Sequence, residues 1–257
     1  MSSPLASPVS WDLVAREYAK VTAPFFANYA NAALELAQVQ AGSRLLDIAA
    51  GPGTLSLLAA QRGCKVTAID FAPNMIEELK AEANSRGVHV DTIVGDGQAL
   101  PLDSHQFDAA FSMFGLIFFP ERAKGFKEMH RTLAPGGVGL VASWQPMERF
   151  AMLADVFGAL RSLLPNLPFG DGKAPLGEPS EIVGEMTAAG FESVRVEEVS
   201  ASAEAPNLDQ AWSFLSRGSA PFALVRRGIG ETAWQGVEQG IVARLREKYG
   251  SGAQTLT

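Results

Sequence analysis

The sequence predicts an α/β fold in which helices flank a mostly parallel sheet, and two observations favour this class. Between residues 43 and 144, segments typical of strands alternate with segments of helical period. Alternation of this kind produces right-handed βαβ units and a parallel sheet covered on both faces. The 25 glycines and 15 prolines supply the tight connections that such units need. A chain of 257 residues also buries enough surface to fold without a metal or a disulfide.

The expected elements follow one another without a long gap. Thr54 is expected to cap the first helix, and Pro73 suits the first turn of the second. Pro120 is expected to begin the third helix, and the Pro-Gly-Gly run at 135–137 is expected to end it. The expected strands are 44–49, 65–70, 89–94, 107–113 and 138–143.

The last third of the chain changes in character. Residues 149–164 have helical spacing, whereas 165–179 hold four prolines and three glycines, which predicts a mobile lid or spacer. A further helix, a sixth strand at 191–199 and two more helices are expected after it. The predicted division is a helical cap at 1–40, an α/β core at 41–145, and substrate-side helices with the last strand or strands of the sheet at 146–257.

Composition excludes several classes of function. The net charge of -7 argues against binding to nucleic acids or anionic membranes. The single cysteine, Cys64, excludes a disulfide framework and a thiolate-rich zinc site, and no metal is expected. No apolar run reaches the length of a membrane span. The first residues lack a signal-peptide pattern, so a cytoplasmic location is expected; the sequence leaves a homodimer open.

The residues that follow the first two strands favour nucleotide binding. Gly51 and Gly53 allow a tight turn and the close approach of a ligand, and the next helix offers free N–H groups. Asp70 lies at the end of the second strand, where a carboxylate can accept both hydroxyls of a ribose. After the third strand, Asp96 can accept a bond from an adenine amino group, while the backbone of Gly97 and Gln98 can face the ring.

Five runs of residues together resemble one family. They are Leu-Leu-Asp-Ile-Ala-Ala-Gly-Pro-Gly-Thr at 45–54, Ala-Ile-Asp-Phe-Ala-Pro-Asn-Met at 68–75, Gly-Asp-Gly-Gln-Ala-Leu-Pro at 95–101, Phe-Asp-Ala-Ala-Phe-Ser at 107–112, and Arg-Thr-Leu-Ala-Pro-Gly-Gly at 131–137. They resemble the class I S-adenosylmethionine-dependent methyltransferases, and in particular the ubiquinone/menaquinone-biosynthesis C-methyltransferases and their small-molecule relatives. The resemblance covers residues 9–144 well and implies a Rossmann-like sheet.

The resemblance also implies a set of cofactor-binding residues. The first loop would hold the methionine part, the acid after the second strand the ribose, and the acid after the third strand the adenine. Carried over, the residues are Tyr18, Asp47, Ala49, Gly51, Gly53, Asp70, Phe71, Met75, Asp96, Gly97, Gln98 and Met113. Two features depart from the family: Ala49 stands where glycine is usual, and the last residues, 250–257, are barely long enough for its seventh, antiparallel strand.

The expected chemistry is methyl transfer to a small, largely hydrophobic or aromatic acceptor by in-line displacement. Tyr18 is the one catalytic candidate; it is expected to contact the cofactor's carboxylate or the acceptor, or merely to pack its ring. The expected acceptor residues are Phe25, Phe114, Trp144, Phe150 and Trp212.

Two alternatives remain from the sequence. A nicotinamide-dependent oxidoreductase would use G-x-G-x-x-G, but Ser56 stands at the third glycine position. The other is a non-catalytic, cofactor-binding partner subunit.

Overall fold

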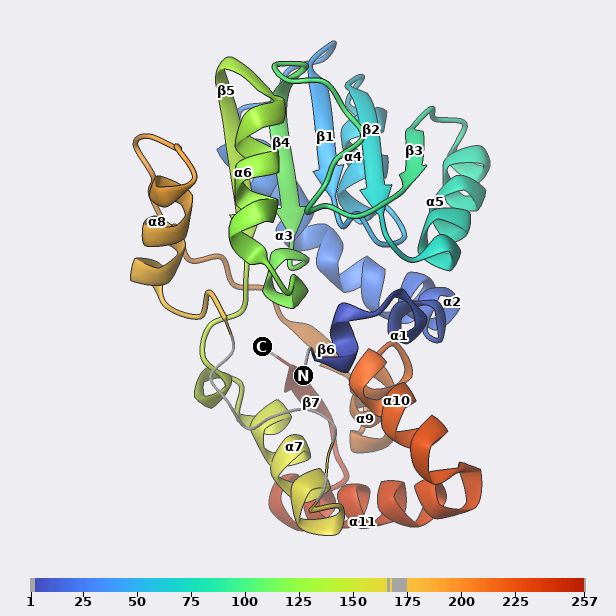
Figure 1. The fold of residues 1–257 in the computed structure, drawn as a ribbon. Helices are drawn as coiled ribbons and strands as arrows, with labels where there is room; N and C mark the ends of the chain where they lie inside the picture. The colour runs from blue at the N-terminus through green and yellow to red at the C-terminus, as the bar shows by residue number, and fades with distance from the viewer. Residues whose placement is uncertain (1–2, 166, 168–174, 257) are drawn as a thin grey trace.

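The central feature of the protein is a five-stranded parallel sheet. A computed structural model describes residues 3–165, 167 and 175–256 (Figure 1). The strand order is β3-β2-β1-β4-β5, and every pair is parallel. The strands are β1 (Arg44–Ile48), β2 (Lys65–Asp70), β3 (Asp91–Val94), β4 (Phe107–Met113) and β5 (Leu133–Ala142). The predicted α/β class with a mostly parallel sheet is therefore confirmed.

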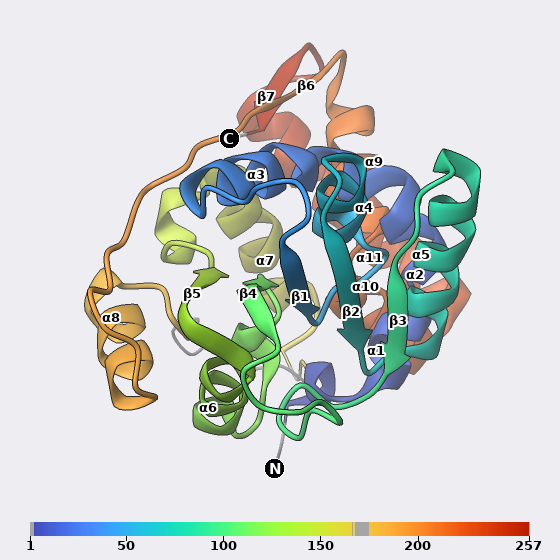
Figure 2. The same ribbon diagram turned by 90° about the horizontal axis from the view of Figure 1, so that it is seen from above.

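Helices cover both faces of the sheet, as Figure 2 shows. On one face, α3 (Ala23–Leu36) and α4 (Thr54–Gln61) pack on β1 and β4 around Leu45 and Phe111, which are fully buried. On the other face, α6 (Arg122–Thr132) packs through Met129 against Leu46 and Ala110. The helix α5 (Pro73–Arg86) has Ile76, Leu79 and Ala83 inward, as their spacing predicts.

Three predicted helix boundaries were wrong. The helix α6 begins at Arg122 rather than at Pro120. Thr54 does not cap α4: Gly53 is the N-cap, in a left-handed conformation with φ of 81°. A side chain there would collide with Leu79, because a Cβ would lie 2.1 Å from Leu79 Cδ1. The helix α6 ends at Thr132, and the Pro-Gly-Gly run lies within β5. Leu133 already pairs with Phe107, and a register shift after that pair accommodates the run.

The N-terminal segment lies along the carboxyl edge of the sheet (Figure 1). It consists of η1 (Pro4–Ala6), α1 (Pro8–Asp12), α2 (Ala15–Glu17) and the π-helical turn η2 (Tyr18–Thr22), which leads into α3. Asp12 ties the segment to α5, because its Oδ1 accepts a hydrogen bond of 2.8 Å from the Asn74 backbone N–H.

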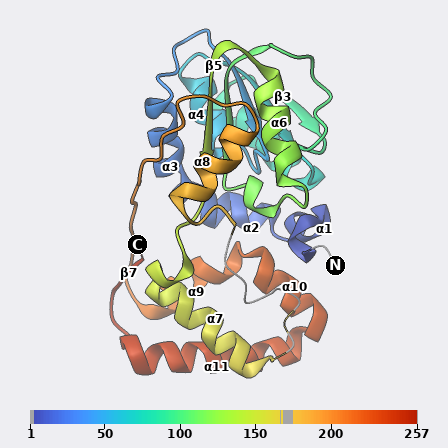
Figure 3. The same cartoon turned by 60° about the vertical axis from the view of Figure 1, so that its left-hand side comes forward.

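The C-terminal helices form a second core beyond the carboxyl ends of the strands (Figures 1 and 3). They are α7 (Ala151–Leu163), α9 (Leu208–Arg217), α10 (Ala220–Ile229) and α11 (Glu231–Tyr249), whereas α8 (Pro179–Ala188) lies beside β5 and α6. Their core contains Leu160, Trp212, Phe222, Trp234 and Ile241. The short helices η3 (Leu116–Phe118) and η4 (Met147–Arg149) follow β4 and β5.

The predicted sixth strand is absent from the described residues. Residues 191–199 pair with no strand there, so β5 is an edge strand, and a cavity of about 1260 Å³ lies between β5 and residues 190–201. The last strand, β7 (Gln254–Leu256), is antiparallel, but it pairs with β6 (Ala203–Ala205) in a separate sheet. The predicted lid at 165–179 falls largely on residues 166 and 168–174, which lie outside the described residues.

Within the described ranges, no helix combines the length and the apolar character that crossing a membrane requires.

Candidate functional site

The loops that follow β1 and β2 meet at the carboxyl edge of the sheet. The last residue of β2, Asp70, binds both loops: its Oδ2 accepts a hydrogen bond of 2.8 Å from the Gly51 N–H, and its Oδ1 accepts one of 2.9 Å from the Ala72 N–H. Burial raises the pKa of Asp70 to about 6, although these hydrogen bonds oppose the shift. Each carboxylate oxygen has two lone pairs, so Asp70 can still accept hydrogen bonds from a ligand.

A second buried carboxylate lies one strand away. Asp47 is 1% exposed, and its Oδ2 accepts a hydrogen bond of 2.6 Å from Ser56 Oγ. Burial raises its pKa to about 7; the Ser56 bond opposes this shift and the nearby charge of Asp70 adds to it. Two acids whose pKa values lie near neutrality give this edge a charge that depends on pH and on what binds there.

The loop that follows β1 has an unusual backbone conformation. Gly51 has a φ of 56°, and a Cβ built on it would meet no atom within 4 Å, so open space lies beside it. Ala49 is also left-handed, with φ of 57°, which strains a residue that has a side chain. Its methyl group faces Gly115, where a Cβ would lie 2.4 Å from Ala49 Cβ. Alanine, in place of the glycine that is usual in the family, therefore fits at position 49 because Gly115 has no side chain.

Tyr18 closes this edge from the N-terminal side. A cavity of about 50 Å³ is bounded by Tyr18, Phe26, Asp47, Gly51 and Met113, together with Ala30, Ala49, Ala50, Pro52, Thr54 and Leu55. Burial, and then the nearby charge of Asp70, raise the pKa of the Tyr18 hydroxyl well above its usual range. The phenol therefore stays protonated at neutral pH, which makes it a hydrogen-bond donor and a poor general base.

The loop after β3 is organised around Asp96 and Gln98. Asp96 Oδ1 accepts hydrogen bonds from the backbone N–H of Gln98 at 2.8 Å and from its Nε2 at 3.0 Å. Gln98 Oε1 in turn accepts one from the Glu121 N–H at 2.7 Å. A Cβ on Gly97 would lie 2.6 Å from the Phe119 ring, so this glycine permits close packing of the loop.

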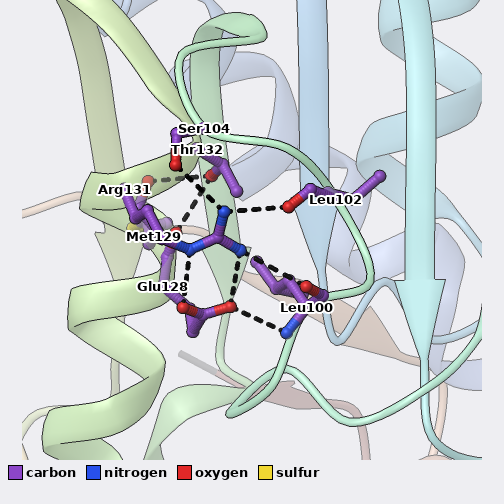
Figure 4. Close-up of polar contacts among 7 residues, drawn as sticks. All are labelled: Leu100, Leu102, Ser104, Glu128, Met129, Arg131 and Thr132. Carbon is purple, nitrogen blue, oxygen red and sulfur yellow. Dashed lines mark hydrogen bonds and ion pairs between the residues drawn. The ribbon is translucent and has the colours of Figure 1, made fainter.

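Arg131 of α6 holds the rest of this loop in place (Figure 4). Its Nη1 donates to the Leu102 carbonyl at 2.8 Å and its Nη2 to the Leu100 carbonyl at 3.3 Å, while Glu128 accepts from Nε and Nη2. Glu128 also accepts from the Leu100 N–H at 2.8 Å. The ion pair explains why an arginine stands in this motif: a planar guanidinium can bridge a carboxylate and two carbonyls at once.

Aromatic side chains gather next to Met113, at the ends of β4 and β5. The rings of Phe114 and Trp144 are stacked, with centroids 4.3 Å apart. Phe26 and Tyr29 of α3 present ring edges to both, and Phe150 presents one to Trp144. We call these five residues the aromatic cluster. Phe114 has a φ of 61°, a strained conformation for a bulky residue at a candidate site.

The remaining predicted residues have different surroundings. Phe25 contacts Phe26, Tyr29 and Phe214 and so borders the aromatic cluster. Trp212 lies in the core of the C-terminal helices, where its Nε1 donates to Glu238 Oε1 at 2.8 Å and its ring packs against Phe222. Met75 is 2% exposed and Phe71 partly buried, and both pack under the N-terminal segment.

Sequence reasoning missed Tyr29 and Phe214. Tyr29 lies four residues beyond Phe25 on α3, a spacing that places both on one helix face. That spacing was a usable signal, whereas nothing local indicated Phe214.

The chain has clear relatives. A family model described as a methyltransferase domain matches residues 45–137. A demethylmenaquinone methyltransferase of Thermus thermophilus is 32% identical over 185 residues, which cover 64% of this chain and 81% of that protein. This chain belongs to the S-adenosylmethionine-dependent methyltransferases. This family uses S-adenosylmethionine as its cofactor, and the nicotinamide-dependent alternative receives no support.

Two further matches show how much of this chain is similar to other proteins. An uncharacterized protein of Mycobacterium tuberculosis is 29% identical over 154 residues, which cover 60% of this chain and 55% of that protein. The chain thus spans about half the length of this relative. The crystal structure of the cyclase SpnF has the same fold, with a TM-score of 0.53, 23% identity, and coverage of 90% of this chain and 78% of that one.

The residues at the carboxyl edge fit the cofactor in their chemistry. Open space beside Gly51, two buried acids and spare acceptor capacity on Asp70 suit a ligand with ribose hydroxyls and positive charge. Among the residues that the structure describes, no group of three or more His, Cys, Asp or Glu side chains is placed to hold a metal ion.

Proposed function

We propose that this protein transfers the methyl group of S-adenosylmethionine to a small, largely hydrophobic or aromatic acceptor. One observation carries the proposal: Met113 bounds the cavity beside Asp47 and Gly51, and the next residue, Phe114, belongs to the aromatic cluster. The polar side of the site and the apolar side therefore meet at one point of the sheet edge, where a cofactor and an acceptor would come into contact.

Several residues would hold the cofactor. Asp70 would accept hydrogen bonds from the ribose hydroxyls, and the loop from Ala49 to Gly53 would contact the amino-acid part. Asp96 and Gln98, already fixed to each other, would face the adenine ring, and Phe71 would pack against it. Tyr18, as a protonated phenol, would donate a hydrogen bond to the carboxylate.

The chemistry needs little from the protein beyond alignment. The sulfonium of the bound cofactor supplies an activated methyl group, and in-line displacement follows when the acceptor atom is held in line with the breaking bond. The aromatic cluster would exclude water and orient an apolar acceptor, and ring faces attract a nearby cation. Because Tyr18 stays protonated, we assign it to positioning and leave proton removal to the acceptor's own acidity or to solvent.

The acceptor class rests on the aromatic cluster and on one relative. The Thermus thermophilus relative is named a demethylmenaquinone methyltransferase, which is consistent with an aromatic acceptor here. The fold alone does not decide the reaction, since SpnF shares it and is named a cyclase. We therefore keep a cofactor-binding subunit without methyl transfer as the competing hypothesis.

The deciding experiment follows a labelled methyl group. The full chain would be incubated with methyl-labelled S-adenosylmethionine, a panel of small phenols, quinols and aliphatic acids, and separately with protein and RNA. Transfer to a small apolar molecule is expected. Label on protein or RNA alone would contradict the acceptor class, and cofactor binding without any transfer would favour the binding subunit.

The cytoplasmic location and the absence of nucleic-acid partners stay predictions from sequence, and a homodimer stays open. Fractionation, nucleic-acid binding assays and light scattering would test them in turn.

A further inference from the structure

The end of α9 packs against η2, the turn that contains Tyr18. Gly218, which follows α9, is buried, and a Cβ on it would lie 2.0 Å from Thr22 Oγ1 and 3.3 Å from Tyr18 Cα. The backbone of the C-terminal helices thus lies directly against η2, at a distance that only glycine permits. A π-helical turn at this point is itself unusual and is frequent at functional sites.

An ion pair joins the same two elements. Arg217, the last residue of α9, donates to Glu17 Oε2 from Nε at 2.8 Å and from Nη2 at 2.6 Å. Both side chains are largely exposed, so the pair adds little stability by itself. Its position beside Gly218 makes it a second tie between α9 and the end of α2.

The parts of the chain on either side of η2 are anchored elsewhere. Asp12 binds the α1 end to Asn74 of α5, and α3 packs on α4 and the sheet through Ala30, Ala33 and Leu34. Residues 15–22 form the bridge between these anchors. The end of α9 supports the bridge at η2, and α10 packs against Ala15 and Tyr18.

The cavity under this bridge is too small for the expected cofactor. It holds about 50 Å³, whereas pockets that bind ligands of this size measure roughly 300–1,000 Å³. Tyr18 of the bridge is one of the residues that line it. Enlarging this part of the site requires Tyr18 to move, and the contacts of α9 with η2 resist that movement.

We propose that Gly218 and Arg217 form a latch on the Tyr18 turn, so that the C-terminal helices govern the exchange of the cofactor. The proposal rests on the proposed function only in taking S-adenosylmethionine and its product as the ligands. A loosened latch lets η2 open more easily, and both association and dissociation then become faster. Gly218 and Arg217 touch no ligand; they act as positioning residues through Tyr18.

The test compares exchange rates in matched variants of the full chain. Association and dissociation of S-adenosylhomocysteine would be followed by stopped-flow fluorescence, and its Kd by calorimetry. For Gly218→Ala we expect dissociation about tenfold faster, which corresponds to a barrier lowered by about 1.4 kcal/mol. Arg217→Gln, which leaves the core intact, should show a smaller acceleration of about twofold to threefold, since exposed ion pairs are weak.

Two further variants separate a latch from a general loss of structure. Thr22→Ala combined with Gly218→Ala removes the oxygen that the new methyl group would meet, and exchange should return toward the original rates. Gly228→Ala is the matched control, because this exposed glycine of α10 has open space around it and no contact with η2; its rates should not change.

Unchanged rates in both Gly218→Ala and Arg217→Gln would overturn the latch. Equal acceleration in Gly228→Ala would overturn it as well. Latch-dependent exchange in a protein that transfers no methyl group to any acceptor would overturn the proposed function and leave the latch standing.

Discussion

The two sides of the candidate site are held together by different forces. On the cofactor side, buried carboxylates are bound by backbone N–H groups and by Ser56, and three left-handed residues shape the loop. On the acceptor side, five aromatic rings pack against one another, and stacking and edge contacts replace hydrogen bonds.

This difference predicts different responses to change. A polar network of buried groups tolerates little substitution, because each lost partner leaves a buried group unsatisfied. Apolar packing tolerates substitutions of similar volume. The cofactor side should therefore be sensitive to single atoms and to pH, and the acceptor side to shape.

The largest effect is expected for Asp70→Ala. The substitution removes the acceptor of the Gly51 and Ala72 N–H groups as well as the proposed ribose contact, so affinity for S-adenosylhomocysteine should fall by about 100-fold or more, equivalent to about 2.7 kcal/mol. Calorimetry measures this loss of affinity. Asp108→Asn is the control, because Asp108 pairs with Arg44 at the opposite edge of the sheet; an equal loss there would show that charge alone matters.

A substitution that changes the shape of the acceptor side should affect turnover of the acceptor and leave cofactor binding unchanged. In Trp144→Leu the stacking partner of Phe114 is lost, and kcat/KM for the acceptor should fall about tenfold through poorer alignment. Affinity for S-adenosylhomocysteine should stay the same. Phe157→Leu, in the core of the C-terminal helices, should lower stability only. If Trp144→Leu weakened cofactor binding instead, the division into two sides would be wrong.

The pH should act on the cofactor side in two opposite ways. Asp47 and Asp70 have pKa values of about 7 and about 6 when folded, above their ordinary value of 3.8. The folded, cofactor-free protein therefore holds more protons than the unfolded chain, and its stability should fall as pH rises from about 4 to 7. Chemical denaturation at several pH values measures this slope.

Cofactor affinity should change in the other direction. Ribose hydroxyls and a positive charge favour ionised carboxylates, so binding of S-adenosylmethionine should strengthen between about pH 6 and 8. Calorimetry across this range would detect it, and Asp70→Asn should flatten the curve. A flat curve in the unchanged protein would contradict the assignment of ionised acids to the bound state.

The smallest effect is expected for Ala49→Gly. Glycine removes the strain of a left-handed alanine but also increases the freedom of the unfolded chain, so the net gain in unfolding free energy should be about 0.5–1 kcal/mol. Thermal denaturation measures it. Gly115→Ala alone should destabilise the protein, and the pair Ala49→Gly with Gly115→Ala should recover part of the loss.

Regular elements of the sheet were predictable because their signals are local. The strands β2 and β4 begin and end where their buried runs do, and the helix after Pro73 has the inward residues that its period indicates. The candidate residues of the cofactor side could also be selected from the sequence, because they lie directly after strands. The end of α6 could not be predicted from the sequence, because the pairing of Leu133 with Phe107 is a long-range contact.

The acceptor side was predicted only in part, for a physical reason. A tryptophan at helical spacing points toward some core, and the spacing does not say which. Trp212 of α9 lies among the C-terminal helices, whereas Trp144, which follows β5, lies in the aromatic cluster. Residues 191–199 have the composition of a strand but no partner strand in the described residues.

The free edge of β5 has a consequence for handling the protein. Six residues of this strand pair with β4. Among the described residues no strand pairs with its other side, where a cavity separates it from residues 190–201. Such an edge can template hydrogen bonding between molecules. Concentrated samples should therefore be checked for slow, concentration-dependent assembly, and a lysine in place of Val138, which is 43% exposed on that strand, offers a direct way to suppress it.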